Sequence, residues 1–589
     1  MKIISQLAEL ETAQLVRRVD DGEPTYAFRH ALTQEAAYES LLHTDRRAMH
    51  HHVAQAYEAL YGNRCLDDYA AILAQHYAAA GDDGQTLVYA MRAGDVAARL
   101  YANAEAIAFY SQALEAAKRG NATTAQFVHL YTKRGRVFEV TGRDPEALST
   151  YEEMTEFSRA RDDRALELQS LLLQGKLRSV LSVAFDRAKA LALADEANVL
   201  ARELGDRKAQ AQSLWNQLLV YLYNSELPDA IRCGEQAWVL ACELDARELQ
   251  GYILTDLARA YLQSGQVSKM VPLQAQARAI WRELDNKPML ADNLMQSATL
   301  AMLHGDYDAT IALAEEGTEI SKTIDSKVSL LSNQGTLLFP YLDRGELDHA
   351  LQLANDIVRV SMEVRLNFNP PMAYAFAALT FGFVGAFERG EEMAQRVREI
   401  VSQPLPEFFR AWAWVLLARY YLVVGNVSAA LTALSASQME NHAGHVDPAS
   451  LFGVIAQGEC LLARHEYERA VQLMANRVTM LRQLGFRQSL HDALFIQAKA
   501  MRALGETDHA FELLNEARTE AERIPSRRLL WQIYTTLSEM ESERGNMAHA
   551  ENYRTHARAT IGHIVEHTPP NLRASFLNRH DVRAVMKSR

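Results

Sequence analysis

Residues 408–438 read FFRAWAWVLLARYYLVVGNVSAALTALSASQ and contain the unit from which most of the chain is built. Apolar residues recur every three or four positions on both sides of Gly425, as they do in amphipathic helices. Glycine readily takes the left-handed backbone that ends a helix. The stretch therefore predicts two helices, over residues 408–424 and 427–438, with a turn at Gly425 and Asn426.

A turn residue like Gly425 recurs every 40 residues through the second half of the chain. The positions are Gly265, Gly305, Gly345, Gly385, Gly425, Gly505 and Gly545, with His465 in the remaining place. A small residue follows five positions after most of these turns, at Ala350, Gly390, Ala430, Ala470, Ala510 and Ala550. Because small side chains let two helices approach closely, we expect a repeated helical hairpin that crosses at these residues.

The pattern continues towards the N-terminus with less regular spacing. Two upstream units share one spacing of small and aromatic residues: Gly94, Ala97, Tyr101, Ala106 and Tyr110 in one, and Gly135, Phe138, Gly142, Ala147 and Tyr151 in the other. Further units centre near Phe185 and Ser225. We therefore expect about a dozen hairpins over residues 85–561.

This alternation of small and aromatic residues resembles the tetratricopeptide repeat. The period of that family is 34 residues, so a period of 40 implies longer helices or longer connections. The resemblance implies an all-α fold in which the hairpins stack into a right-handed superhelical solenoid with a concave inner surface.

The N-terminal segment differs from the repeats. Residues 15–19 and 25–29 read as two short strands around a turn and resemble the wing of a winged helix. The continuation FRHALTQEAAYESLL at residues 28–42 is similar to the segment that follows the ATPase module in large bacterial signal-transduction ATPases, many of them linked to class III adenylate or guanylate cyclases. LAQHYAAAG at residues 73–81 and LRASFL at residues 572–577 agree with that family.

This resemblance implies four parts. They are a partial winged helix at residues 1–45, a helical linker at residues 46–84, the repeat array at residues 85–561 and a C-terminal tail at residues 562–589. In the family a nucleotide-binding domain precedes the wing, whereas here Met1 falls inside the expected winged helix.

The sequence contains no motif that predicts catalysis or a cofactor. A Gly-x-x-x-x-Gly-Lys-Ser/Thr phosphate-binding loop is absent, and residues 175–177, Gly-Lys-Leu, lack both the hydroxyl and the earlier glycine. Neither a Gly-x-Ser-x-Gly elbow nor a His-Glu-x-x-His motif occurs. We therefore expect no enzymatic activity, no catalytic residue and no cofactor.

The histidines and cysteines predict no metal site. His50, His51 and His52 are consecutive and would point about 100° apart on a helix, so they cannot share one ion. Cys233 and Cys242 are too far apart on one helix for a disulfide. We expect both cysteines to be buried as small apolar side chains.

Composition narrows the classes of partner. The formal charge of −13 disfavours nucleic acid and anionic membranes. The chain shows no secretory signal and has only four cysteines, which fits a cytoplasmic protein. Glycine and proline together make about 7% of the residues, against an average near 12%, as expected for long helices with few turns.

Aromatic residues concentrate at residues 368–421, and aromatic and arginine side chains dominate interface hot spots. In tetratricopeptide repeats the first helix of each hairpin lines the groove. The resemblance therefore assigns partner contact to Trp215, Tyr252, Arg259, Trp412, Arg419 and Glu459.

Three hypotheses about function remain. The leading one is a non-enzymatic interaction scaffold that binds a protein or peptide segment in its groove and regulates an ATPase or cyclase. The second is a fragment of an ATP-binding signalling enzyme, an ATPase or adenylate cyclase, whose catalytic half is missing. The third is a sensor of a small-molecule inducer.

Overall fold

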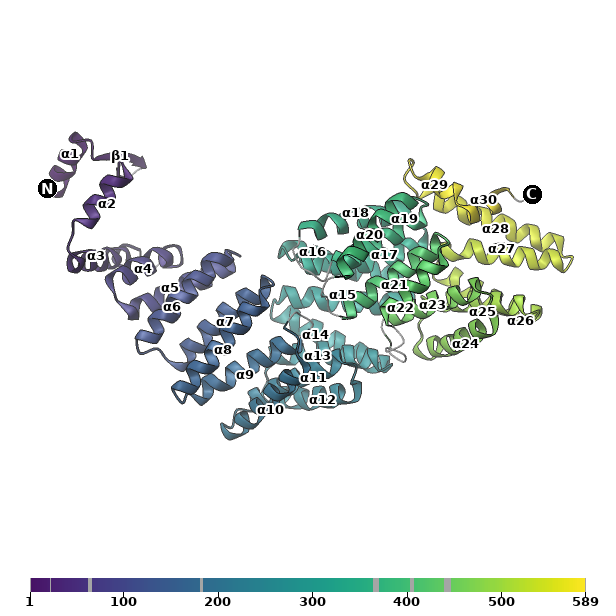
Figure 1. Ribbon diagram of the computed structural model, residues 1–589, viewed down its shortest axis with the longest axis horizontal. Helices are drawn as coiled ribbons and strands as arrows, with labels where there is room; N and C mark the ends of the chain where they lie inside the picture. Colours follow the sequence, from purple (N-terminus) through teal and green to yellow (C-terminus); the bar gives the residue numbers. More distant parts are fainter. Residues whose placement is uncertain are drawn as a thin grey trace. The chain divides into compact units, whose positions relative to one another are not determined.

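The computed structural model describes residues 2–21, 23–61, 66–180, 184–363, 370–402, 407–438, 446 and 448–587, and is almost entirely helical (Figure 1). The chain divides into two compact units, Met1–Leu177 and Arg178–Arg589, called unit 1 and unit 2 below. The expected all-α class with one small β-hairpin is confirmed in the described residues.

Unit 1 starts with a helix and a β-hairpin and continues in helices. Its elements are α1 (Lys2–Thr12), β1 (Val16–Asp21), β2 (Glu23–Phe28), α2 (Ala31–Glu39), α3 (His43–Tyr61), α4 (Leu66–Ala80), α5 (Asp83–Arg99), α6 (Asn103–Arg119), α7 (Thr124–Val140), α8 (Asp144–Ala160) and most of α9 (Arg164–Ser179).

Unit 2 contains the remaining helices. They are α10 (Arg187–Glu203), α11 (Arg207–Tyr223), α12 (Leu227–Glu243), α13 (Arg247–Gln263), α14 (Val267–Glu283), α15 (Lys287–His304), α16 (Tyr307–Thr323), α17 (Lys327–Arg344), α18 (Leu347–Glu363), α19 (Pro370–Phe383), α20 (Phe387–Val401), α21 (Glu407–Val423), α22 (Val427–Ser437), α23 (Pro448–Ala463), α24 (Tyr467–Leu484), α25 (Leu490–Ala503), α26 (Thr507–Arg523), α27 (Arg527–Glu543), α28 (Met547–Glu566), α29 (Arg573–Asn578) and α30 (His580–Lys587).

The predicted turns at the seven glycines and at Tyr101, Ser225 and His465 are confirmed, whereas Phe185 does not have a positive φ. All seven glycines of the 40-residue series have a positive φ, and Tyr101, Ser225 and His465 adopt the same left-handed backbone. The helices predicted around Gly425 are α21 and α22, within one residue at each boundary.

A second series of turns, which the glycine pattern does not reveal, lies midway between the first. Gly205, Asp245, Asp285, Asp325, Gly485 and Pro525 also have a positive φ. The helices from α10 to α14 are each 17 residues long and alternate with three-residue connections. Two such helices with their connections account for the 40-residue period, and for its excess over 34.

Small residues allow the close helix contacts that the sequence predicts. A Cβ atom on Gly94 would lie 2.7 Å from the ring of Tyr110, and one on Gly390 would lie 2.6 Å from the ring of Tyr420. Ala430 is fully buried where α21 and α22 pack together. The small positions are therefore where a neighbouring side chain covers the helix backbone.

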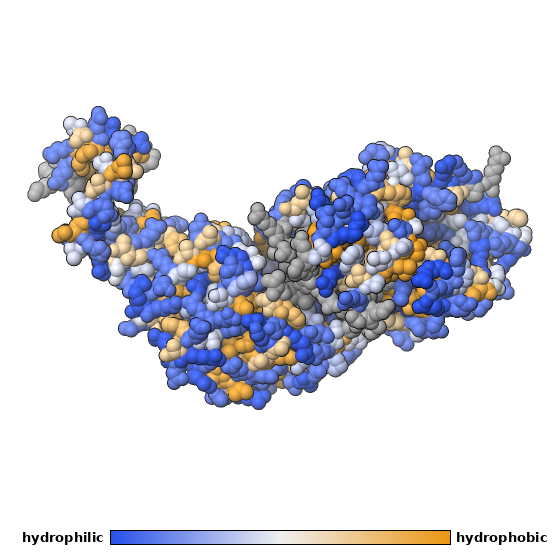
Figure 2. Space-filling view, in the orientation of Figure 1, coloured by the Kyte–Doolittle hydropathy of each residue, from blue (hydrophilic) through white to orange (hydrophobic). Residues whose placement is uncertain are grey.

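The first 61 residues bury little apolar surface. The two strands pair antiparallel with Val16 opposite Phe28, which confirms the expected β-hairpin. α2 has no buried residue, and Leu32 and Leu42 are 79% and 70% exposed. Figure 2 shows apolar side chains at the surface of this segment.

Within unit 2, later hairpins pack back onto earlier ones and form one large core cluster beside several smaller ones. Four carbonyl groups at or next to the C-terminal ends of α13, α15, α17 and α19 each accept a hydrogen bond from a much later residue. Two of the donors are backbone amides: Val446 N donates to Gln263 O (3.2 Å), and Arg487 N donates to Leu303 O (2.9 Å). The other two are side chains: Arg527 donates to Arg344 O (3.2 Å), and Arg579 donates to Phe383 O (2.8 Å). Arg527 follows Arg344 by 183 residues, between four and five repeats. These bonds satisfy carbonyls that have no partner inside their own helix.

Candidate functional site

The six predicted contact residues form two clusters within unit 2. The Arg259 cluster consists of Trp215, Tyr223, Tyr252, Asp256, Arg259 and Asp292. The Arg419 cluster consists of Trp412, Arg419, Phe452 and Glu459. A third group, the Arg528 triad, consists of Asp343, Asp492 and Arg528 and was not predicted from the sequence.

Aromatic stacking builds one side of the Arg259 cluster. The ring of Trp215 on α11 stacks on Tyr252 of α13 with centroids 5.1 Å apart, and Trp281 meets Tyr252 edge-on at 5.0 Å. The indole N–H of Trp215 donates to Asp256 Oδ2 at 2.9 Å. Trp215 is buried, whereas Tyr252 is partly exposed. Tyr252 is therefore, like Tyr223, an aromatic side chain of this cluster that a partner could reach.

Arg259 is surrounded by acceptors. Its guanidinium donates to the Tyr223 hydroxyl at 3.1 Å and lies 3.4 Å from Asp256 and 3.7 Å from Asp292. Burial works to lower the pKa of Arg259, but these three neighbours raise it overall. Burial also raises the pKa of Asp256, although Arg259 opposes that effect. The side chain of Arg259 keeps a quarter of its surface exposed, so one cation is both held and accessible.

Aromatic packing also surrounds Trp412, here in a buried setting. Trp412 lies 5.9 Å from Phe452 and 6.4 Å from Phe376, and Phe339 stacks on Phe452 at 4.7 Å. These four rings come from α17, α19, α21 and α23, the first helices of four successive hairpins. Only 7% of Trp412 is exposed. Within the aromatic-rich stretch at residues 368–421, Trp412 and Phe376 therefore belong to the core, whereas Phe387 is 41% exposed.

Arg419 is buried without a hydrogen-bonding partner among the described residues. It is 8% exposed, and its guanidinium lies 4.9 Å above the ring of Phe452. Burial lowers the pKa of Arg419, and the neighbouring charge of Arg528 lowers it further. An arginine has five N–H donors, and those of Arg419 donate to no side chain or carbonyl among the described residues.

Glu459 lies one repeat after Arg419 and is partly exposed. Burial raises the pKa of Glu459, and the nearby Asp492 raises it too, whereas Arg419 and Arg528 act in the opposite direction. Compared with water, this environment therefore favours the neutral form of the Glu459 carboxyl group.

The Arg528 triad connects helices that are far apart in the sequence. Arg528 Nε donates to Asp343 Oδ1 at 2.6 Å, and its Nη2 donates to Asp492 at 2.8 Å. Tyr307 donates to the second oxygen of Asp343. Burial alone would raise the pKa of Asp492, but Arg528, with His491 and Arg419, lowers it to about 2. Asp492 lies two repeats after Trp412, so the period could have identified it as an equivalent position.

The histidines give two further clusters. His50 Nδ1 lies 2.8 Å from His76 Nδ1, and His50 Nε2 lies 2.9 Å from the Tyr38 hydroxyl. These contacts form a hydrogen-bonded chain of three side chains within unit 1.

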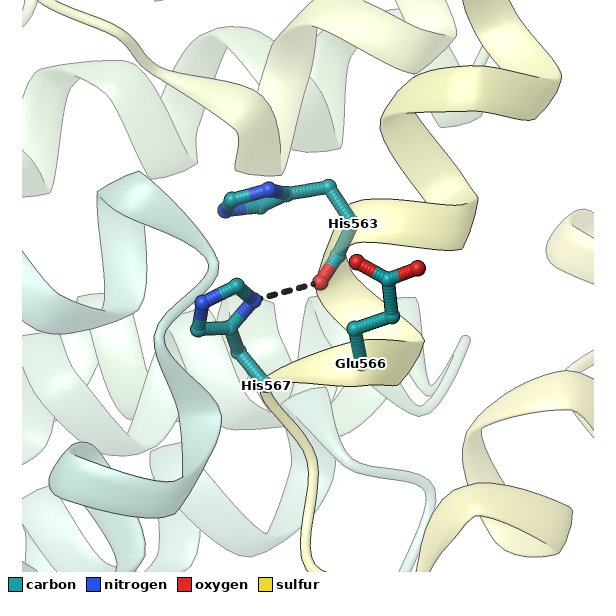
Figure 3. A group of neighbouring side chains, drawn as sticks. All are labelled: His563, Glu566 and His567. Atoms are coloured by element: carbon teal, nitrogen blue, oxygen red, sulfur yellow. Dashed lines mark hydrogen bonds between the residues drawn. The ribbon is translucent and has the colours of Figure 1, made fainter.

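His563, Glu566 and His567 at the end of α28 offer potential metal ligands (Figure 3). The imidazole rings of His563 and His567 stack at 4.1 Å, and His567 Nδ1 bonds to the His563 carbonyl at 2.9 Å. Figure 3 shows both imidazole rings on one side of the helix, with the Glu566 side chain beside them. One ligand atom from each of the three side chains lies within 4.8 Å of the other two.

Among the described residues, no helix is both long enough and apolar enough to cross a bilayer. No protein-family model matches the chain, and no curated protein matches it.

Solved structures give distant matches. A chain from the crystal structure of the APC/C hetero-tetramer Cut9–Hcn1 aligns with 91% of this chain and 96% of its own length, at 12% identity and a TM-score of 0.49. A Rap protein complexed with the competence and sporulation factor aligns with 50% of this chain and 88% of its own, at 12% identity and a TM-score of 0.39. The assignment of a helical-hairpin solenoid rests on the hairpins described above.

Proposed function

We propose that the protein is a non-enzymatic scaffold that binds a protein or peptide segment through the hairpins of unit 2. The observation that carries this proposal is the Arg259 cluster, where Tyr252 and Arg259 are held by neighbours and remain partly exposed. Aromatic and arginine side chains in a fixed position are the residue types that dominate protein interfaces. Glu459 is a third accessible candidate, whereas Trp215, Trp412 and Arg419 could reach a partner only if their hairpins moved apart.

The regulatory context of this scaffold is a bacterial, cytoplasmic signal-transduction system. The resemblance of residues 28–42, 73–81 and 572–577 to signal-transduction ATPases supports this part of the proposal. The ATPase or cyclase, attached or separate, would have an inactive and an active state. A partner that binds one of these states more tightly would shift the equilibrium towards that state and so change the enzyme's activity.

An affinity capture with matched variants tests the proposal. Wild-type protein, a Tyr252→Ala/Arg259→Ala variant and an Arg396→Gln control are used as bait in one extract, and partners are quantified by mass spectrometry. Arg396 lies on α20 with its side chain 59% exposed, so its substitution removes a charge away from the cluster.

We expect at least one protein that the wild type and the control retain and the double variant loses. Identical partner lists for all three baits, with unchanged circular dichroism, would contradict the assignment of this surface.

A further inference from the structure

A small cavity lies inside unit 2, between the Arg419 cluster and the Arg528 triad. Its lining includes Phe339, Asp343, Phe383, Arg419, Gln488 and Arg528. These residues come from α17, α19, α21 and α27 and from the segment before α25. The packing of later hairpins onto earlier ones therefore creates this cavity.

The repeat shows which side chains are missing around Arg419. Arg419 lies four repeats after Arg259, at the equivalent position. The three acceptors of Arg259 are Tyr223, Asp256 and Asp292, and the positions four repeats after them hold Phe383, Leu416 and Phe452. The arginine is thus present in both repeats, whereas all three acceptors are replaced by apolar side chains. One replacement, Phe383, lines the cavity.

Apart from the Asp343 carboxylate, the polar side chains that line this cavity carry N–H donors: Arg419, Gln488 and Arg528. Arg419 donates no hydrogen bond within the described part of the chain, and there the Gln488 amide N–H groups donate none. The Gln488 oxygen already accepts from Ser489 at 2.8 Å. The Asp343 oxygens are engaged by Arg528 and Tyr307. A group that fits this cavity must therefore supply acceptors.

The two carboxylates of the Arg528 triad outnumber its one guanidinium, so Arg419 supplies the positive charge that an anion in this cavity would meet. Arg528 pairs with both Asp343 and Asp492 at 3.0 Å or less. Burial raises the pKa of Glu459, which favours its uncharged form. Arg419 is left without a carboxylate within 4 Å among the described residues.

We propose that this cavity binds a compact oxyanion, a carboxylate or phosphate group of a small molecule, through the guanidinium of Arg419 and the amide of Gln488. The planar guanidinium fork suits such a group because it can donate two parallel hydrogen bonds. This binding is separate from the proposed partner surface at Tyr252 and Arg259.

Calorimetric titration of the full chain with inorganic phosphate and, separately, with succinate tests the proposal. Ionic strength is held constant with sodium chloride. We expect saturable binding of at least one of the two anions, weakened about tenfold or more in Arg419→Gln because a charge-assisted hydrogen bond is lost. The Arg396→Gln control is expected to bind like the wild type.

Failure of both anions to bind, or equal affinity in Arg419→Gln, would overturn the proposal. A second measurement needs no variant: wild-type crystals are soaked in selenate and examined by anomalous scattering. A selenium peak within hydrogen-bonding reach of Arg419 supports the site, and its absence there overturns it.

Discussion

Arg259 and Arg419 occupy the same position in repeats four periods apart, yet their surroundings are opposite. Arg259 has a hydroxyl and two carboxylates within 4 Å and is partly exposed. Arg419 is buried over Phe452 with no acceptor in the described residues. A repeat unit thus fixes where an arginine lies, and the later hairpins that pack against it decide whether it is exposed or enclosed.

The largest effect is expected at Arg528, the paired arginine beside Arg419. Arg528→Met leaves Asp343 and Asp492 buried without their cation, and breaking such a pair costs about 3–5 kcal/mol. Urea unfolding measures this loss. Adding Asp343→Asn and Asp492→Asn to the variant should restore part of the stability. A loss under about 1 kcal/mol would show that the triad does not hold the hairpins together.

The free energy of unfolding at low pH is expected to depend on the same triad. The pKa of Asp492 is lowered to about 2 in the folded state from an ordinary value of 3.8. This carboxylate therefore stabilises the fold above about pH 4, and that stabilisation is lost as the pH falls towards 2. We expect the stability difference between wild type and Asp492→Asn to be constant from pH 7 to about 5 and to shrink by roughly 2 kcal/mol at lower pH. A difference that grows on acidification would contradict this sign.

Removing a hydroxyl group beside Arg259 and adding one beside Arg419 tests the comparison between the two arginines with the smallest changes. Tyr223→Phe removes an acceptor from Arg259 and is expected to cost about 1 kcal/mol. Phe383→Tyr places a hydroxyl at the equivalent position beside Arg419, so it should raise stability by up to about 1 kcal/mol. It should also weaken phosphate binding, because the hydroxyl competes for the same donors. Denaturation midpoints that shift in the same direction in both variants would argue against equivalent positions.

Much of the fold could be predicted from local pattern. The turns at Ser225 and His465 can be predicted without a glycine because the 40-residue period extends through them, and the turn at Tyr101 follows from the spacing that its unit shares with the unit around Gly142. The second turn series, such as Asp245 and Asp285, has the same period but lacks a single residue type that would reveal it. A search for the period alone, without regard to glycine, would have found both.

The candidate site could be predicted only in part. The period correctly places Tyr252 with Trp412 and Arg259 with Arg419 at equivalent positions. The period does not reveal the contact between Arg528 and Asp343, which are 185 residues apart. That contact depends on how tightly the stack of successive hairpins curves. Burial of Trp412 and Arg419 follows from that packing and is invisible in a single repeat. Partner contact at the six residues remains a prediction.

The most direct test of the central claim compares the same substitution at the two arginines. The free energy of unfolding is measured in urea for Arg259→Met and for Arg419→Met. Arg259→Met is expected to cost about 1.5–3 kcal/mol because it removes hydrogen bonds between charged groups. Arg419→Met is expected to change stability by less than about 1 kcal/mol, because the lost contact with Phe452 is offset by removing a buried charge that has no acceptor among the described residues. Equal losses in the two variants would contradict the claim that equivalent arginines have been given opposite surroundings.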